Sequence, residues 1–204
     1  MPDGLAFVSE THEVWATTPR SNSLTIIDAH DVAHLKVAAK VTLDGEPEGY
    51  AVDGHGHFIT NLEDLDRTAI FDVKTRKEIQ RGQPGCGEEG PRGIAIDASA
   101  HALFVACKDH VAALDLADGL KLLATVPTGA GVDNIDYVPS LHQVFAAGGH
   151  AATLTIARFT GKAFEKLATI PTSEGVRVVV AAPNGTAFAA DSKNGRLLVT
   201  SPVK

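Results

Sequence analysis

Five charged side chains recur at one position of the sequence, each just before a short apolar run. They are 41 to 45 residues apart and comprise Asp3, Glu48, Arg92, Asp133 and Arg177. Carboxylate oxygens, together with the amide of Asn134, are ligands that a hard divalent cation prefers. Guanidinium groups instead pair with carboxylates or bind an anion through two hydrogen bonds. The spacing therefore supports three interpretations: a ring of ion pairs, a site for a small anionic or polar ligand, and a divalent-metal site.

A second group of polar residues is suited to proton transfer. His110 and His150 lie in turns about 40 residues apart, and Asp109 precedes His110. Imidazole titrates near neutral pH, so these three residues are candidates for general acid/base work. With Glu48 and Asp133, the two histidines are also the candidate metal ligands. The alternative is that all of them are solvated turn residues.

Four further histidines keep the same spacing, three residues ahead of a phenylalanine or tryptophan: His12, His55, His101 and His142. Zinc requires nitrogen ligands at about 2.0–2.1 Å that converge on one point. One histidine in each of several separate turns does not provide that arrangement. We therefore expect turn residues that hydrogen-bond their own backbone. The His55-Gly56-His57 segment shows no acidic or cysteine partner close by that would make it a metal motif.

The two cysteines, Cys86 and Cys107, permit one disulfide. Their spacing fits neither a zinc ribbon nor a redox Cys-x-x-Cys motif. Both are expected on the same side of the fold, so a bond between them is one outcome and two free thiols the other. As a nucleophile, Cys107 shows no obvious adjacent histidine.

Composition excludes several classes of function. The net charge is −7, with 18 basic and 25 acidic residues and no basic cluster, which argues against nucleic acid. No apolar run approaches the roughly 20 residues that a membrane span needs. The first residues lack the pattern of a secretory signal, which leaves the compartment open. Dinucleotide, phosphate-loop, nucleophile-elbow and haem motifs are missing, so the sequence specifies no cofactor beyond the divalent metal already considered.

The elements that must hold these residues repeat as well. Aromatic anchors recur every 41 to 46 residues, at Trp15, Phe58, Phe104, Phe145 and Phe188. Around each anchor lie short β-branched or aromatic runs, bounded by Gly, Asp, Asn or Pro, which predict four antiparallel strands per repeat. This period is typical of a β-propeller. We predict an all-β, single-domain propeller over residues 1–204, with five blades at about 1–44, 45–88, 89–129, 130–172 and 173–204.

Three segments resemble the bacterial YVTN-repeat propellers: Pro-Asp-Gly-Leu-Ala at the start, residues 46–53 and residues 90–97. The resemblance covers essentially the whole chain and is specific for fold but weak for function. It implies an exported protein, periplasmic or extracellular, and a full-length relative with seven blades, about two of them upstream. The alternative is an intact five-bladed form that closes less regularly. Gluconolactonase-type and paraoxonase-type propellers hold calcium at the channel mouth. Here Arg92 and Arg177 would repel such an ion, which favours ion pairs or an anionic ligand.

The last repeat has three predicted strands, so a sheet edge is expected to lie exposed at the end of the chain. An exposed apolar edge tends to recruit another chain, and we therefore predict a homodimer through the terminal blades. The function we expect is that of a scaffold that binds a small polar or anionic ligand, or a protein partner, at the channel mouth. The alternative is a metal-assisted hydrolase of the lactonase or phosphotriesterase kind that uses the same mouth.

Overall fold

A computed structural model describes residues 2–203 and contains five antiparallel sheets that follow one another along the chain. Four sheets have four strands and the last has three, and the strands of each sheet lie in chain order. The strands are β1 Leu5–Val8, β2 Glu13–Thr18, β3 Ser23–Asp28, β4 Lys36–Thr42, β5 Pro47–Val52, β6 His57–Leu62, β7 Arg67–Asp72, β8 Lys77–Gly82, β9 Ile94–Asp97, β10 Ala102–Ala106, β11 His110–Asp115, β12 Lys121–Pro127, β13 Val132–Val138, β14 Gln143–Gly148, β15 Thr153–Phe159, β16 Phe164–Pro171, β17 Val179–Ala181, β18 Ala187–Asp191 and β19 Arg196–Thr200.

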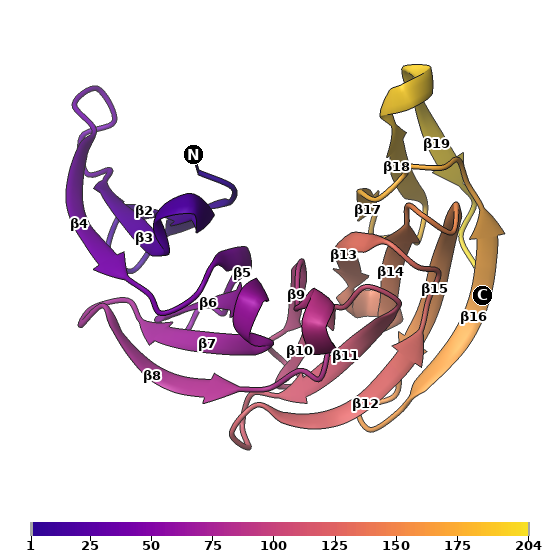
Figure 1. Ribbon diagram of the computed structural model, residues 1–204, viewed down its shortest axis with the longest axis horizontal. Coiled ribbons are helices and arrows are strands. Elements are labelled where there is room, and N and C mark those ends of the chain that lie inside the picture. The colour runs from indigo at the N-terminus through magenta and orange to yellow at the C-terminus, as the bar shows by residue number, and fades with distance from the viewer. Residues whose placement is uncertain (1, 204) are drawn as a thin grey trace.

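The sheets are arranged like the blades of a propeller. In Figure 1 they fan around an open arc, with β5, β9, β13 and β17 on the inner side and β4, β8, β12 and β16 on the outer side. The predicted all-β propeller with an incomplete last blade is therefore confirmed. Helix is limited, in residues 2–203, to five 3-10 segments of three residues each: η1 Pro19–Ser21, η2 Glu63–Leu65, η3 Gly87–Glu89, η4 Pro139–Leu141 and η5 Ser192–Asn194. None of the helices in this part of the chain is long and apolar enough to cross a membrane.

A left-handed residue closes the turn between the first and second strand of every blade. The φ angles are 51° at His12, 90° at Gly56, 51° at His101, 53° at His142 and 86° at Gly185. Glycine adopts this region freely, and histidine is among the few other residues enriched there. The recurring histidine is therefore a turn residue, as predicted. In the second blade, however, the equivalent residue is Gly56 rather than His55. The predicted equivalence of His55 with the other three histidines was therefore wrong by one residue.

Each pair of consecutive blades encloses one apolar cluster. Trp15, Phe104 and Phe145 are fully buried and point toward the following blade, and Ile59 takes this position in the second blade. Phe58 lies on the opposite face of its sheet and packs against Trp15, with ring centroids 5.1 Å apart. The predicted anchor Phe58 is thus not equivalent to the others.

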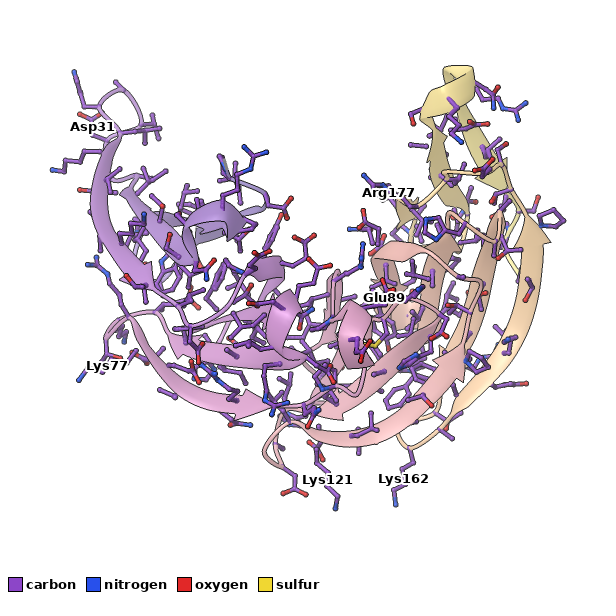
Figure 2. The ribbon with its side chains drawn as sticks, viewed as in Figure 1. Asp31, Lys77, Glu89, Lys121, Lys162 and Arg177 are labelled. Carbon is purple, nitrogen blue, oxygen red and sulfur yellow. A yellow bond between two sulfur atoms is a disulfide. The ribbon has the colours of Figure 1, made fainter. Side chains whose placement is uncertain are left out.

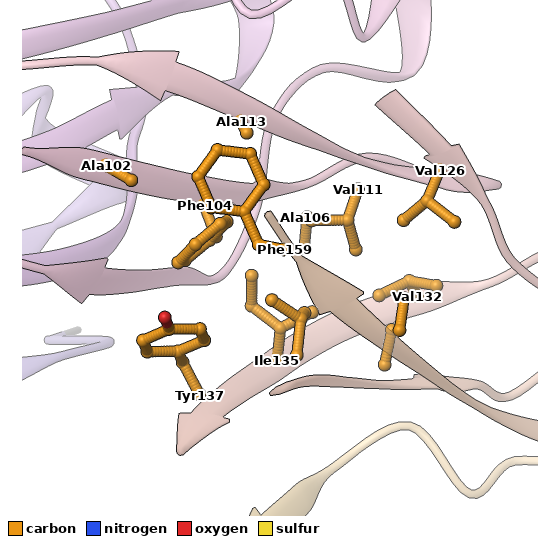
Figure 3. Close-up of a cluster of buried hydrophobic side chains, with 13 residues drawn as sticks. Ala102, Phe104, Ala106, Val111, Ala113, Val126, Val132, Ile135, Tyr137 and Phe159 are labelled. Atoms are coloured by element: carbon orange, nitrogen blue, oxygen red, sulfur yellow. The ribbon is translucent and has the colours of Figure 1, made fainter. Parts of the chain in front are cut away.

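Figure 3 shows the cluster between the third and fourth blades, where the rings of Phe104, Tyr137 and Phe159 meet. The ring centroid of Phe104 lies 4.6 Å from that of Tyr137 and 5.2 Å from that of Phe159. Close-packed aromatic pairs of this kind resist relative sliding of the two sheets. The apolar clusters between the blades therefore hold the inner strands, and the residues at their ends, at fixed separations.

The first and the last blade each have one sheet face that no neighbouring blade covers, and both of these faces are apolar and exposed. On the first blade, Phe7, Val14, Ile27 and Val37 are direct cross-strand neighbours, and Phe7 and Val37 are 57% and 66% exposed. On the last blade, Val180, Phe188 and Val199 form the corresponding row, with the two valines each 60% exposed. Each row crosses its sheet where an internal blade would be covered by its neighbour.

Candidate functional site

The inner strands bring the five entry residues into one series around the inner side of the arc. Glu48 lies in β5 and Asp133 in β13, while Arg92 and Arg177 each lie two residues before a strand, β9 and β17 respectively. Backbone hydrogen bonds link neighbouring blades at this level. The Gly93 N–H donates to the Asp133 carbonyl at 2.9 Å, and the Asn134 N–H donates to the Arg177 carbonyl at 3.2 Å. The entry loops are therefore fixed relative to one another by main chain.

Asp133 is the centre of the charge pairing. Its carboxylate lies 3.4 Å from Nη1 of Arg92 and 3.5 Å from Nε of Arg177. Arg92 also reaches Glu63, with 3.2 Å between Nη2 and Oε1. These distances exceed the 2.7–2.9 Å typical of a strong charge-assisted hydrogen bond. The buried Nε of Arg92 has no hydrogen-bond partner, so this guanidinium group keeps unused donor capacity.

A cavity of about 510 Å³ opens beside this pair and spans the third, fourth and fifth blades. Four cationic side chains line it against three carboxylates, in a chain whose net charge is −7. The charged lining residues are Arg92, Lys108, Arg177, Lys193, Glu89, Asp133 and Glu174. Lys108 pairs with Glu89 at 2.6 Å, whereas Lys193 and Glu174 are 3.5 Å apart. Figure 2 shows Arg177 and Glu89 on the inner side of the arc, with Lys77, Lys121 and Lys162 at the outer rim.

Glycine backbone forms part of the cavity wall. The Gly149 N–H donates to the Gly131 carbonyl at 2.9 Å, and the Gly175 N–H donates to the Gly149 carbonyl at 2.8 Å. A Cβ on Gly131 would stand 2.6 Å from the backbone nitrogen of His150, and its φ of 84° is left-handed. Glycine at this position therefore lets the segment that enters the fourth blade pack closely against the β14–β15 turn of the same blade, at the cavity wall.

A second cavity of about 660 Å³ lies on the other side of Asp133 and has an acidic lining. Asp3, Glu48, Tyr50 and Asn134 contribute to it. Burial is the largest cause that raises the pKa of Glu48, to about 7; the negative charges of Asp3, Glu63 and Asp133 act in the same direction and the charge of Arg92 opposes them. The mouth is thus divided into a cation-lined half and an acid-lined half that share one carboxylate.

The structure separates the two candidate acid/base histidines. His150 lines the cation-lined cavity. Nδ1 of His110 lies 2.8 Å from Oδ1 of Asp109, as an adjacent pair, and a ring nitrogen of His110 lies close to Cys86 and Cys107. On the opposite side of the blades, Nδ1 of His57 lies 2.6 Å from Oδ2 of Asp53. The prediction that the His55–His57 segment has no acidic partner close by was therefore wrong.

The two cysteines form a disulfide, with their Cα atoms 5.0 Å apart. Within residues 2–203, one group of three or more His, Cys, Asp or Glu side chains has ligand atoms close enough for a metal, and it consists of Cys86, Cys107 and His110. His110 is the neighbour of Cys107 that the sequence did not reveal, although only two residues separate them. Glu48, Asp133 and His150 do not belong to that group, and a divalent ion at the mouth stays a prediction.

Two residues of the cation-lined cavity were missed from the sequence, namely Lys108 and Lys193. Both lie in turns between the second and third strand of their blades. Lys108 stands between Cys107 and Asp109, and Lys193 stands between Ser192 and Asn194. All four flanking residues are polar or sulfur-bearing residues of those same turns. The signal that could have found the two lysines is their position in turns that lie on the same side of the fold.

Comparison with known proteins gives matches in structure alone. The sequence matches no protein-family model, and no curated protein matches it. A chain of the mitotic checkpoint complex superposes with a TM-score of 0.80 at 14% identity, over 97% of this chain and 60% of that one. Hydrazine synthase of Kuenenia stuttgartiensis gives a TM-score of 0.72 at 17% identity, over 91% of this chain and 55% of that one.

A putative 6-phosphogluconolactonase of Bacteroides fragilis gives a TM-score of 0.74 at 16% identity, over all of this chain and 70% of that one. The likeness is one of fold. This chain spans less than two thirds of the length of the first two structures. A function for this chain must therefore be argued from its own side chains.

Proposed function

We propose that this propeller binds a small anionic ligand in the cation-lined cavity at its mouth. One observation carries the proposal: Arg92 and Arg177 share Asp133 at 3.4 and 3.5 Å, and the buried Nε of Arg92 has no partner. Guanidinium groups held this loosely retain donors for a carboxylate or phosphate. Lys108 and Lys193 add positive charge from the adjacent turns.

The shape of the mouth favours a ligand with a second, uncharged polar end. A molecule anchored by its anion beside Arg177 would extend past Asp133 into the acid-lined cavity. With a pKa of about 7, Glu48 is partly protonated at neutral pH and can donate a hydrogen bond as well as accept one. A hydroxylated carboxylic acid or a sugar phosphate has this combination of groups. The resemblance to YVTN-repeat propellers is compatible with such a scaffold role.

Titration calorimetry with gluconate, gluconate 6-phosphate and inorganic phosphate tests the proposal. Arg177→Gln should weaken binding by about tenfold or more, because one charge-assisted bond contributes about 1.5–3 kcal/mol. Lys162→Gln, at the outer rim, is the matched control and should leave affinity unchanged. Equal affinity of the wild type and Arg177→Gln for every anion that binds would reject this location.

The raised pKa of Glu48, about 7, also favours a second candidate, hydrolysis of a lactone at the same mouth. A carboxyl group with a pKa near 7 is well matched to general acid/base catalysis. One structural neighbour is described as a putative 6-phosphogluconolactonase. Lactone and phosphotriester turnover, measured with and without a chelator, tests this candidate and the accompanying divalent metal. Turnover that Glu48→Gln leaves intact would exclude Glu48 as the acid/base.

For the partner of the scaffold, we propose a second copy of this chain. Each sheet has one face toward the preceding blade and one face toward the following blade. Within the chain, every blade interface joins the second kind of face on one sheet to the first kind on the next. One copy exposes one face of each kind, the Val180–Phe188–Val199 row and the Phe7–Val14–Ile27–Val37 row. Phe7→Glu should shift sedimentation from dimer to monomer, and Val32→Glu, in an exposed loop, should not. A wild-type chain that is monomeric at high micromolar concentration would rule out the dimer.

A further inference from the structure

The disulfide lies beside a histidine in a geometry that suits a second chemical state. Cys107 and His110 flank the two-residue turn between β10 and β11, and the Cys107 N–H donates to the His110 carbonyl at 2.9 Å. Residues paired in this way project from the same face of the hairpin with Cβ atoms about 4.5–5.5 Å apart. The ligand atoms of Cys86, Cys107 and His110 all lie within 4.8 Å of one another.

We propose that, once the disulfide is reduced, Cys86, Cys107 and His110 bind one Zn²⁺ ion. Thiolate and imidazole are the ligands that zinc prefers, at about 2.3 Å and 2.0–2.1 Å, which places ligand atoms roughly 3.5–3.8 Å apart around a tetrahedral ion. The His110 ring nitrogen lies within 4.8 Å of both sulfurs, and reduction of the S–S bond lets the two sulfurs separate to that spacing. Water fills the fourth position. This site is independent of the anion-binding function proposed for the mouth.

The third ligand has a carboxylate contact on one of its ring nitrogens. Nδ1 of His110 contacts Oδ1 of Asp109 at 2.8 Å, which leaves Nε2 with the lone pair that a metal needs. A carboxylate on the far nitrogen of a metal-binding histidine is a common supporting contact. The His110 side chain is 21% exposed and Cys86 is half-buried, whereas Cys107 is fully buried. An ion therefore has access from the Cys86 and His110 side.

The loop that carries Cys86 is held independently of the disulfide. The N–H groups of Cys86 and Gly87 donate to the Asp66 carboxylate at 2.9 and 3.2 Å. The Gln83 side chain donates to the same carboxylate at 3.1 Å. Because these bonds do not involve sulfur, they keep Cys86 close to Cys107 after the S–S bond breaks. The two thiols therefore stay near each other at little cost in chain entropy.

The chemistry requires a reductant, and a trialkylphosphine is the one to use. The phosphine and one water supply two electrons and two protons, the S–S bond breaks to give two thiols, and the phosphine becomes its oxide. Zinc then binds the two sulfurs with release of two protons. A dithiol reductant in the cell would perform the same two-electron step.

Zinc binding to the reduced full-length chain, measured by competition with a chromophoric chelator, tests the proposal. One equivalent should bind with a sub-micromolar dissociation constant, and the oxidised chain should bind none at this site. His110→Asn keeps both cysteines and forms the disulfide, so its fold can be verified before reduction. It should weaken binding at least about tenfold, and Asp109→Asn about 10–100-fold. His55→Asn, in a turn on the opposite side of the blades, is the matched control.

Cobalt gives an independent readout, since tetrahedral Co²⁺ with thiolate ligands absorbs strongly and Cys86→Ser or Cys107→Ser should abolish that absorption. Unchanged zinc affinity in His110→Asn would overturn the three-ligand site. A reduced chain that binds no zinc, or that unfolds and is not refolded by zinc, would overturn the proposal as well.

Discussion

Replacing Glu48 by glutamine should stabilise the protein above neutral pH and have little effect near pH 4.5. In the folded chain, burial and the nearby carboxylates of Asp3, Glu63 and Asp133 raise the pKa of Glu48 to about 7 from an ordinary value of 4.5. The unfolded chain therefore releases this proton first as pH rises. Between about pH 4.5 and 7 the unfolded state binds fewer protons, so the free energy of unfolding falls with increasing pH.

The size of the effect follows from the shift. Each pKa unit corresponds to about 1.36 kcal/mol, which would give an upper bound of about 3 kcal/mol for Glu48. Because the side chain is only half-buried, solvent screening reduces this value, and we expect about 1–2 kcal/mol. Glutamine resembles the protonated form at every pH. The difference in stability between Glu48→Gln and the wild type should thus grow from near zero at pH 4.5 to about 1–2 kcal/mol above pH 7.

Urea titrations at pH 5, 6, 7 and 8, followed by fluorescence, would measure this difference. Trp15 is the one tryptophan and packs against Phe58 in the blade that carries Glu48, so its emission reports on the relevant interface. Glu10→Gln, at an exposed position, is the control and should show no such trend. A difference that stays constant over this pH range would refute the reasoning, as would a variant less stable than the wild type at pH 8.

Three other outcomes follow from the backbone and the disulfide. Gly131→Ala should lower the free energy of unfolding by about 1–3 kcal/mol and weaken anion binding, because its Cβ would meet the His150 nitrogen. Gly54 has a similar φ but open space around it, so Gly54→Ala should lower the free energy of unfolding by less. Thermal melts of the two variants compare these effects. His101→Gly should stay within about 1 kcal/mol of the wild type in the same assay, and His101→Val should lose about 1–2 kcal/mol, since a β-branched residue fits the left-handed turn poorly. Reduction of the disulfide, which spans 21 residues, should lower the free energy of unfolding by about 3 kcal/mol, and equal midpoints of urea unfolding with and without phosphine would contradict this.

The fold could be predicted because each blade is encoded by its own contiguous stretch of about 45 residues. The repeat did not predict which face of its sheet each side chain occupies. Successive strand residues point to opposite faces, so a shift of one position exchanges the two sides of a sheet. Phe58 has the right spacing and the wrong face, and Ile59 occupies the position that Trp15, Phe104 and Phe145 take in other blades. Aromatic spacing alone does not distinguish these cases.

The candidate site was predictable to the extent that it depends on equivalent positions. Arg92, Asp133 and Arg177 precede or begin inner strands, and the spacing of those strands was enough to place them in series. Lys108 and Lys193 come from a different turn, and their reach into the cavity depends on the angle between blades, which no sequence pattern reports. The disulfide is a similar case, because 21 residues of separation set no distance between two sulfurs.

The stacking of the sheets has a consequence for how this protein comes apart. Each sheet packs on the one before it and the one after it, as in a linear repeat protein, so its stability is the sum of local terms and neighbour terms. In a single copy, the last sheet has three strands and one packed face, so in the monomer it should open at the lowest free energy. Amide exchange of the monomer should then be fastest in β17–β19 and slowest in β10 and β14.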